Sequence, residues 1–125
     1  MEDEIFGDVI YSYTRADALR DGVLVDVSSL AREAGFRYPV AVTARVWHEW
    51  VVPPEEAIGQ DTTGRLWDVL NVLRMEIRKA GQTDRADFRV LFDQGPEKVY
   101  GQFYALCGPG DSGEPVITVM LPEED

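Results

Sequence analysis

Residues 61–80 carry the longest regular hydrophobic pattern in the chain, and this pattern limits what the chain can fold into. Apolar side chains recur there at intervals of three and four residues, which places them on one face of an α-helix. They are Leu66, Val69, Leu70, Leu73 and Ile77. Asp61, Thr62 or Thr63 can cap the start of this helix, and Gly81 follows its end. We therefore expect one long helix whose apolar face is core.

The hydrophobic period changes to two after this helix, which indicates β-strands. Three runs have the length and pattern of strands: residues 87–93, 98–107 and 115–121. Turn-forming residues separate them at positions 94–97 and 108–113. Short turns between consecutive strands predict a three-stranded antiparallel meander. We expect the long helix to pack against the apolar face of this meander.

The first half of the chain predicts shorter elements. Thr14 can cap a helix that ends at Gly22, and Thr43 can cap a helix that runs to Val51. The other expectations are strands over residues 5–13 and 23–27 and a helix over residues 30–34 capped by Ser28 or Ser29, while residues 39–42 fit no single class. Short helices and strands, one long helix and a meander, with no internal repeat and no long linker, predict a single α+β domain over residues 1–125.

Size and composition limit the class of protein. Of the 125 residues, 45% are hydrophobic, and a chain of this length can bury a sizeable core without a metal or a disulfide. Its one cysteine, Cys107, has no partner for an internal disulfide. No apolar run is long enough to span a membrane, and Glu2, Asp3 and Glu4 have the wrong charge for a secretory leader. We therefore expect an intracellular protein.

The sequence has no strong catalytic or metal-binding motif. Cys107 and the single histidine, His48, have no third residue to orient them, and Cys107 falls on the apolar side of its strand. Residues 110–115 are similar to a serine-protease nucleophile loop, but a hairpin turn explains their Gly, Asp and Ser content. Glu55, Glu56 and Asp61 could gather on one loop, but their spacing matches no calcium or zinc pattern. The sequence therefore predicts no catalytic residue, no metal and no cofactor.

Acidic residues greatly outnumber basic ones. Twenty-three Asp and Glu stand against twelve Lys and Arg, which gives a net charge of -11. The net charge is -6 over residues 1–60, +1 over residues 61–83 and -6 over residues 84–125. Such an excess repels nucleic acid and anionic membranes and attracts basic protein surfaces, so we expect a basic protein as partner. The acidic residues expected to contact it are Glu2, Asp3, Glu4, Asp8, Glu55, Glu56, Glu123, Glu124 and Asp125.

Two aromatic groups offer a second kind of contact surface. Trp47 and Trp50 are three residues apart and share one side of a helix. Core packing is the favoured interpretation of this pair, and anchoring of a protein partner is the alternative. Tyr100 and Tyr104 share the half-polar face of the second C-terminal strand, which points outward if the sheet is covered on one side only. These four aromatic residues are therefore further candidates for partner binding.

Several distinctive stretches are spread over most of the chain. They are Ile-Phe-Gly at 5–7, Asp-Gly-Val-Leu-Val-Asp-Val at 21–27, Ala-Gly-Phe-Arg-Tyr-Pro-Val-Ala at 34–41, Gly-Arg-Leu-Trp-Asp-Val-Leu at 64–70, Cys-Gly-Pro-Gly-Asp at 107–111 and Glu-Pro-Val-Ile-Thr at 114–118. In these stretches the chain resembles an uncharacterised domain family of bacterial plasmids, integrating elements and phages. The resemblance implies a mobile-element protein in the cytoplasm of a bacterial host, and it supplies no catalytic residues.

Charge and resemblance together favour one functional hypothesis. Small, acidic, cysteine-poor proteins of mobile elements resemble anti-CRISPR and anti-restriction inhibitors, whose targets grip phosphates through Lys and Arg. We expect an inhibitor that acts as a DNA mimic on a CRISPR effector complex or its nuclease. One alternative is a small enzyme or ligand-binding domain, with a pocket ringed by Asp26, His48 and Asp68. Another is an accessory structural protein of the element. The oligomeric state stays open.

Overall fold

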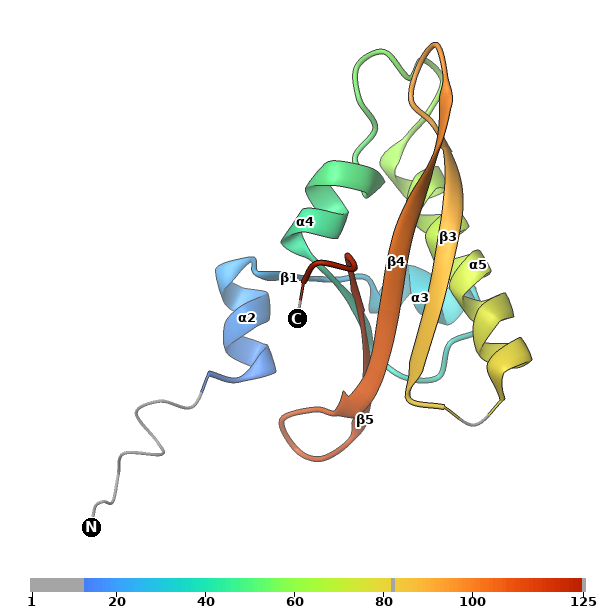
Figure 1. Ribbon diagram of the computed structural model, residues 1–125. Coiled ribbons are helices and arrows are strands. Elements are labelled where there is room, and N and C mark those ends of the chain that lie inside the picture. Colours follow the sequence, from blue (N-terminus) through green and yellow to red (C-terminus); the bar gives the residue numbers. More distant parts are fainter. Residues whose placement is uncertain (1–12, 82, 125) are drawn as a thin grey trace.

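A parallel pair of strands joins the two halves of the chain into one sheet. The computed structural model describes residues 13–81 and 83–124 (Figure 1). Its elements in chain order are α2 (Arg15–Asp21), β1 (Leu24–Asp26), α3 (Ser28–Glu33), β2 (Val40–Thr43), α4 (Ala44–Val46), the π-helical η1 (Trp47–Val51), α5 (Thr62–Ala80), β3 (Arg85–Asp93), β4 (Lys98–Pro109) and β5 (Pro115–Met120). The five strands lie in the order β1-β2-β5-β4-β3. The fold is thus α+β, as expected.

The sheet is larger than the predicted meander, and it is mixed. β3 pairs with β4, and β4 with β5, both antiparallel as the sequence predicts. The other edge of β5, however, pairs in parallel with β2, where Val40 lies opposite Ile117. β2 in turn pairs antiparallel with β1. All four residues of β2 are buried, so this strand lacks the two-residue alternation by which half-exposed strands are recognised.

The helices α5, α3 and η1 form the second layer of the core. In Figure 1, α5 runs alongside β3, against which it packs. Four of its expected core residues are buried, namely Leu66, Val69, Leu70 and Leu73, and Ile77 is partly buried against the same cluster. The phenylalanines Phe88 and Phe103 lie on the sheet face below, with ring centroids 5.5 Å apart. The predicted burial of the long helix is therefore confirmed.

Helix ends follow the local chemistry that the sequence suggests. Thr14 and Asp17 form a capping box at the start of α2, and Gly22 ends this helix with φ at +79°. The carboxylate of Asp61 accepts a hydrogen bond from the N–H of Gly64 at 2.6 Å and so caps α5. These polar contacts satisfy N–H groups that have no partner within the helix.

The predicted capping of α3 by Ser28 or Ser29 is wrong. Val27 is the N-cap residue of α3 and contributes no side-chain hydrogen bond. Asp26, one residue earlier, accepts hydrogen bonds from the backbone N–H of Ser28 at 3.0 Å and from its hydroxyl at 2.6 Å. Asp26 therefore supplies the side-chain acceptor at the start of α3 that was expected from Ser28 or Ser29. The Thr43 cap of the next helix is confirmed, since its hydroxyl accepts from the N–H of Val46.

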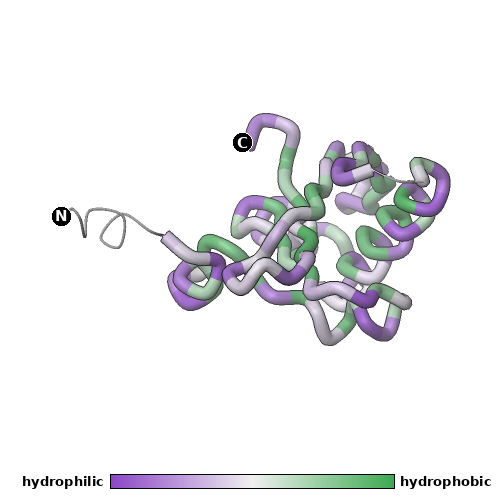
Figure 2. Tube along the Cα trace, turned by 90° about the horizontal axis from the view of Figure 1, so that it is seen from below, coloured by the Kyte–Doolittle hydropathy of each residue, from purple (hydrophilic) through white to green (hydrophobic). Residues whose placement is uncertain are grey.

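Hydrophobic and hydrophilic residues are interspersed along most helices and strands, and the described part of the chain ends in a hydrophilic segment (Figure 2). Over residues 13–81 and 83–124, no helix is both long enough and apolar enough to cross a membrane. The strand expected over residues 5–13 falls outside the described residues, apart from Tyr13.

Candidate functional site

Carboxylates gather at the end of the molecule where α5 begins. The loop of residues 53–61 meets the β3–β4 turn there, because a Cβ atom on Gly95 would lie 2.7 Å from the Cβ of Glu56. Figure 1 shows this loop and turn side by side at the top of the molecule. A groove of about 230 Å³ at this end is lined by Asp68, Asp93 and Lys98. We call this surface the acidic end; its residues are Glu55, Glu56, Asp61, Asp68, Asp93 and Glu97.

A buried arginine fastens the backbone beneath the acidic end. Arg65, at the start of α5, is only 1% exposed. Its guanidinium donates hydrogen bonds to the carbonyls of Trp50 and Asp93, both at 2.8 Å, and to the side-chain oxygen of Gln94 at 2.9 Å. It also lies 4.6 Å from the centroid of the Phe92 ring. Arg65 therefore ties η1, α5 and the β3–β4 turn together and gives the nearby carboxylates a fixed support.

The charges at the acidic end act on one another. Desolvation lowers the pKa of the Arg65 guanidinium, and the negative charges of Asp93 and Asp68 oppose this effect. Desolvation raises the pKa of Asp68, an effect that the positive charge of Arg65 opposes. Lys98 supplies an exposed cation in the same groove. With one exposed cation beside its carboxylates, the acidic end has a net negative charge near neutral pH.

Of this cluster, the sequence predicts Glu55 and Glu56 as partner-binding residues, whereas Asp68 is a candidate only for the pocket of the enzyme alternative. The sequence gives Asp61 as one of three candidate caps of the long helix, Asp93 as the last residue of a strand, and Glu97 as part of the turn that follows it. Each of these positions is predictable from local chemistry alone. That the loop, the helix start and the turn meet at one end is a long-range property, and no pattern in the sequence signals it.

The C-terminal carboxylates are engaged within the fold. The side chain of Glu124 accepts hydrogen bonds from the Thr43 hydroxyl at 2.7 Å and from the Leu121 N–H at 2.9 Å. Glu123 forms an exposed ion pair with Arg45 at 3.0 Å. The remaining terminal candidates, Glu2, Asp3, Glu4, Asp8 and Asp125, lie outside the described residues. Within the described part, the acidic end is thus a better candidate contact surface than the C-terminal pair.

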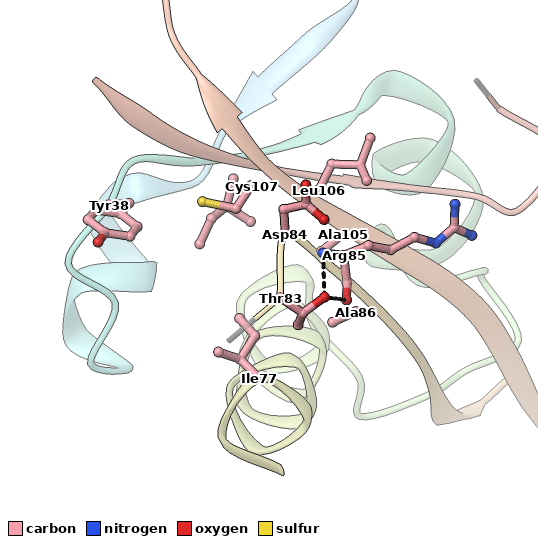
Figure 3. A pocket seen from close by; sticks show the side chains of 10 residues that line it. Tyr38, Ile77, Thr83, Asp84, Arg85, Ala86, Ala105, Leu106 and Cys107 are labelled. Carbon is pink, nitrogen blue, oxygen red and sulfur yellow. Dashed lines mark hydrogen bonds between the residues drawn. The ribbon is translucent and has the colours of Figure 1, made fainter. Parts of the chain in front are cut away.

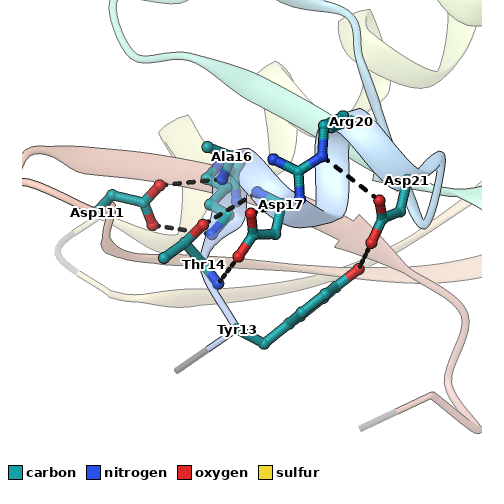
Figure 4. A network of polar contacts seen from close by, with 8 residues as sticks. Tyr13, Thr14, Ala16, Asp17, Arg20, Asp21 and Asp111 are labelled. Atoms are coloured by element: carbon teal, nitrogen blue, oxygen red, sulfur yellow. Dashed lines mark hydrogen bonds and ion pairs between the residues drawn. The ribbon is translucent and has the colours of Figure 1, made fainter. Parts of the chain in front are cut away.

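Carboxylates around α2 also serve the fold. Asp111, in the turn between β4 and β5, accepts hydrogen bonds from the backbone N–H groups of Arg15 at 2.8 Å and Ala16 at 3.0 Å (Figure 4). The backbone N–H of Thr14 donates to Asp17, and this hydrogen bond is the main cause of the lowered pKa of Asp17. Asp17 caps α2, and Asp111 holds the start of α2 against the β4–β5 turn. These structural roles account for both carboxylates, so no protein partner is needed to explain them.

The two tryptophans pack onto the core. Trp47 and Trp50 both lie in η1 and are half-buried against the hydrophobic cluster. The ring of Trp50 lies 5.2 Å from that of Phe92 and 5.9 Å from that of Phe103, measured between centroids. Core packing, the favoured interpretation of this pair, accounts for these contacts.

The two tyrosines on the outer sheet face differ in accessibility. Tyr104 is buried, its hydroxyl donates to the backbone carbonyl of Glu124, and the guanidinium of Arg85 lies 4.1 Å from its ring centroid. Tyr100 is 54% exposed, with the guanidinium of Arg89 at 4.3 Å from its centroid. Of the four aromatic candidates, Tyr100 is therefore the one with the most accessible ring.

The residues of the enzyme alternative lie apart. Asp26 lines a cavity of about 350 Å³ beside α2, Asp68 lines the groove at the acidic end, and His48 is exposed on η1. Cys107 lines a different cavity, beside the C-terminal end of α5. In the part of the chain that the structure describes, no three His, Cys, Asp or Glu side chains form a group that could hold a metal ion.

The family comparison covers nearly the whole chain. A family of unknown function, DUF6573, matches residues 4–125. The chain belongs to this family. No curated protein and no solved structure matches it. Membership agrees with the uncharacterised domain that the sequence resembles and assigns no role to any residue, so the function must be argued from the surface.

Proposed function

We propose that the protein inhibits a host nucleic-acid-directed defence complex, of the CRISPR or restriction type, by binding one of its basic surfaces. The observation that carries this proposal is the acidic end, where exposed carboxylates from a loop, a helix start and a hairpin turn face solvent together. Protein surfaces that bind nucleic acid present Lys and Arg side chains, which neutralise the phosphates of the backbone. A set of carboxylates on fixed backbone can occupy such a surface in place of phosphates.

Charge also supports a kinetic advantage for such an inhibitor. A net charge of -11 attracts a basic partner over a distance and raises the association rate, which falls as salt screens the charges. The terminal acids Glu2, Asp3, Glu4, Asp8 and Asp125 add to this field wherever they lie. In this proposal the acidic end makes the contact, and Tyr100 with Arg89 offers an adjoining aromatic contact on the outer sheet face.

Neutralising the acidic end is expected to slow association with the target. The partner is first captured from a defence-proficient bacterial cell with the wild-type protein, and association rates are then measured at low and high salt. The triple variant Glu55→Gln, Glu56→Gln, Glu97→Gln should associate about tenfold more slowly at low salt, because steering depends on local charge. At high salt the difference from wild type should shrink.

The matched control removes the same amount of charge elsewhere. Glu33, Glu76 and Asp84 are carboxylates outside the acidic end, and the triple variant Glu33→Gln, Glu76→Gln, Asp84→Asn has the same net charge as the first. It should associate at a rate within about twofold of wild type, since steering falls off within a Debye length. Equal slowing by both triple variants, or rates independent of salt, would contradict a role for the acidic end.

Cys107 is expected to be dispensable for this activity. It is a free, partly exposed cysteine on β4, opposite Ile117, and it lines a cavity with Ile77 near the C-terminal end of α5, whereas the acidic end lies where α5 begins. Cys107→Ala should therefore inhibit the target as well as wild type does, at a cost of about 1 kcal/mol in unfolding free energy. Inhibition assays and thermal unfolding check this. A variant that folds but no longer inhibits would bring the nucleophile hypothesis back.

A further inference from the structure

A two-part groove lies where α5 ends. Its inner part is a cavity of about 130 Å³ with a mainly apolar lining, to which Ile77, Ala105 and Cys107 contribute (Figure 3). Its outer part is a hollow of about 280 Å³. Tyr38, Ile77 and Ile117 line both, so the two parts adjoin. In Figure 3 the Tyr38 ring and the Cys107 sulfur face one another across the inner cavity.

The outer part of the groove is strongly basic. Arg37, Arg74 and Arg78 line it, and none of its lining residues is acidic. Within residues 13–81 and 83–124, no carboxylate forms an ion pair with any of these three guanidinium groups. Arg74 and Arg78 are four residues apart on α5, so their like charges repel each other. Three guanidinium groups that pair with no carboxylate in the described part of the chain make a local site for an anion, although the net charge of the chain is -11.

Arg74 is held at the rim of this groove by the shape of the neighbouring backbone. Gly35 has φ at +104°, and a Cβ atom there would lie 2.8 Å from the Nε atom of Arg74. The guanidinium thus lies directly against a position that only glycine can occupy without displacing it. This contact limits where the side chain can go and favours its position along the groove.

We propose that this groove binds a small aromatic anion, such as an aromatic carboxylate. An apolar cavity of about 150 Å³ takes up a benzene ring, so the inner cavity is close to the size of one aromatic ring. Guanidinium groups bind carboxylates through paired, charge-assisted hydrogen bonds. The ring occupies the inner cavity between Tyr38 and Cys107, and the carboxylate lies in the outer hollow on Arg74 and Arg78.

This site is independent of the proposed inhibitory function. It lies at the C-terminal end of α5, and the acidic end lies at the N-terminal end of the same 19-residue helix. At 1.5 Å per residue, Asp61 and Arg78 lie about 25 Å apart along the helix axis, and Asp68 and Arg74 lie about 9 Å apart. Binding of a small anion can be measured on the isolated protein, without a partner, so its outcome does not depend on the inhibitor proposal.

The single cysteine supplies a site-specific reporter. Cys107 is the chain's one thiol, and it lines the inner cavity. A bound ring should shield it, so phenylacetate should slow its alkylation by iodoacetamide at least fivefold at saturation. Phenylacetamide has the same shape without the charge and is the matched control. It should need at least tenfold higher concentration for the same protection, because it cannot pair with the guanidinium groups.

Two further measurements test the basic half of the site. The double variant Arg74→Gln, Arg78→Gln should weaken protection by phenylacetate at least tenfold, whereas Arg32→Gln, on α3 and lining a different cavity, should leave it unchanged. Should the double variant not fold, raising the salt from about 20 mM to about 500 mM should weaken protection of the wild type by phenylacetate and not by phenylacetamide. Absent protection, equal protection by both compounds, or an equal effect of Arg32→Gln would overturn the proposal.

Discussion

Replacing Arg65 by methionine should lower the free energy of unfolding by about 3 kcal/mol, because three part-buried acceptors lose their donor. Methionine has a similar length and can fill the apolar part of the space. It cannot donate to the carbonyls of Trp50 and Asp93 or to the side chain of Gln94. Urea unfolding, followed by far-ultraviolet circular dichroism, measures the loss.

Two control variants separate geometry from charge. Arg65→Lys keeps the positive charge, but one ammonium cannot reach three acceptors that a planar guanidinium spans, so at least half of the loss should remain. Arg89→Met removes an exposed arginine whose described contact is with the Tyr100 ring, and it should cost less than about 1 kcal/mol. Wild-type stability in Arg65→Lys would show that charge alone matters at this position.

The Arg65 contacts also link stability to the proposed function. Its hydrogen bonds hold the β3–β4 turn and η1 against the start of α5, and these segments carry or adjoin the carboxylates of the acidic end. Loss of the anchor would leave the same carboxylates on a less defined surface, and removing the guanidinium makes the net charge one unit more negative. Association driven by long-range steering would survive this change, whereas tight binding that needs fixed carboxylate positions would not.

The elements that local chemistry determines were predictable from the sequence. The three- and four-residue spacing from Leu66 to Ile77 predicted α5 and the face that it buries. Alternation predicted β3 and most of β4. Capping residues marked three helix starts, at Thr14, at Thr43 and within residues 61–63, where Asp61 is the cap. In each case the signal lies within one turn of helix or one pair of strands, where periodicity and hydrogen-bonding side chains act directly.

Long-range pairing was not predictable in this way. β2 is buried on both faces, so its residues do not alternate, and its partner β5 follows more than 70 residues later. Parallel pairing carries no turn that would signal it, unlike the hairpin that joins β3 and β4. The acidic end and the basic groove have the same origin, since each brings together residues from separate elements. Local patterns pointed to single residues of these surfaces, such as Glu55, Glu56 and Cys107, but not to the residues from other elements that lie beside them.

The sharpest test of the core is Leu70→Ala. Leu70 is fully buried at the centre of the apolar face of α5, between that helix and the sheet. Removing its side-chain methyl groups deletes apolar burial and leaves a cavity, which together cost about 2–5 kcal/mol. The midpoint of thermal unfolding should fall sharply, and urea unfolding should show the same loss with little change in its slope.

Met75→Ala, on the same helix, is the matched control. Met75 is 56% exposed, so its truncation removes little buried surface and should change stability by less than about 0.5 kcal/mol. A thermal midpoint of Leu70→Ala within a degree of wild type would contradict the buried face assigned to α5. Loss of stability in Leu70→Ala with none in the Glu55, Glu56 and Glu97 triple variant would separate the two roles: α5 supports the fold, and the fold does not need these three carboxylates.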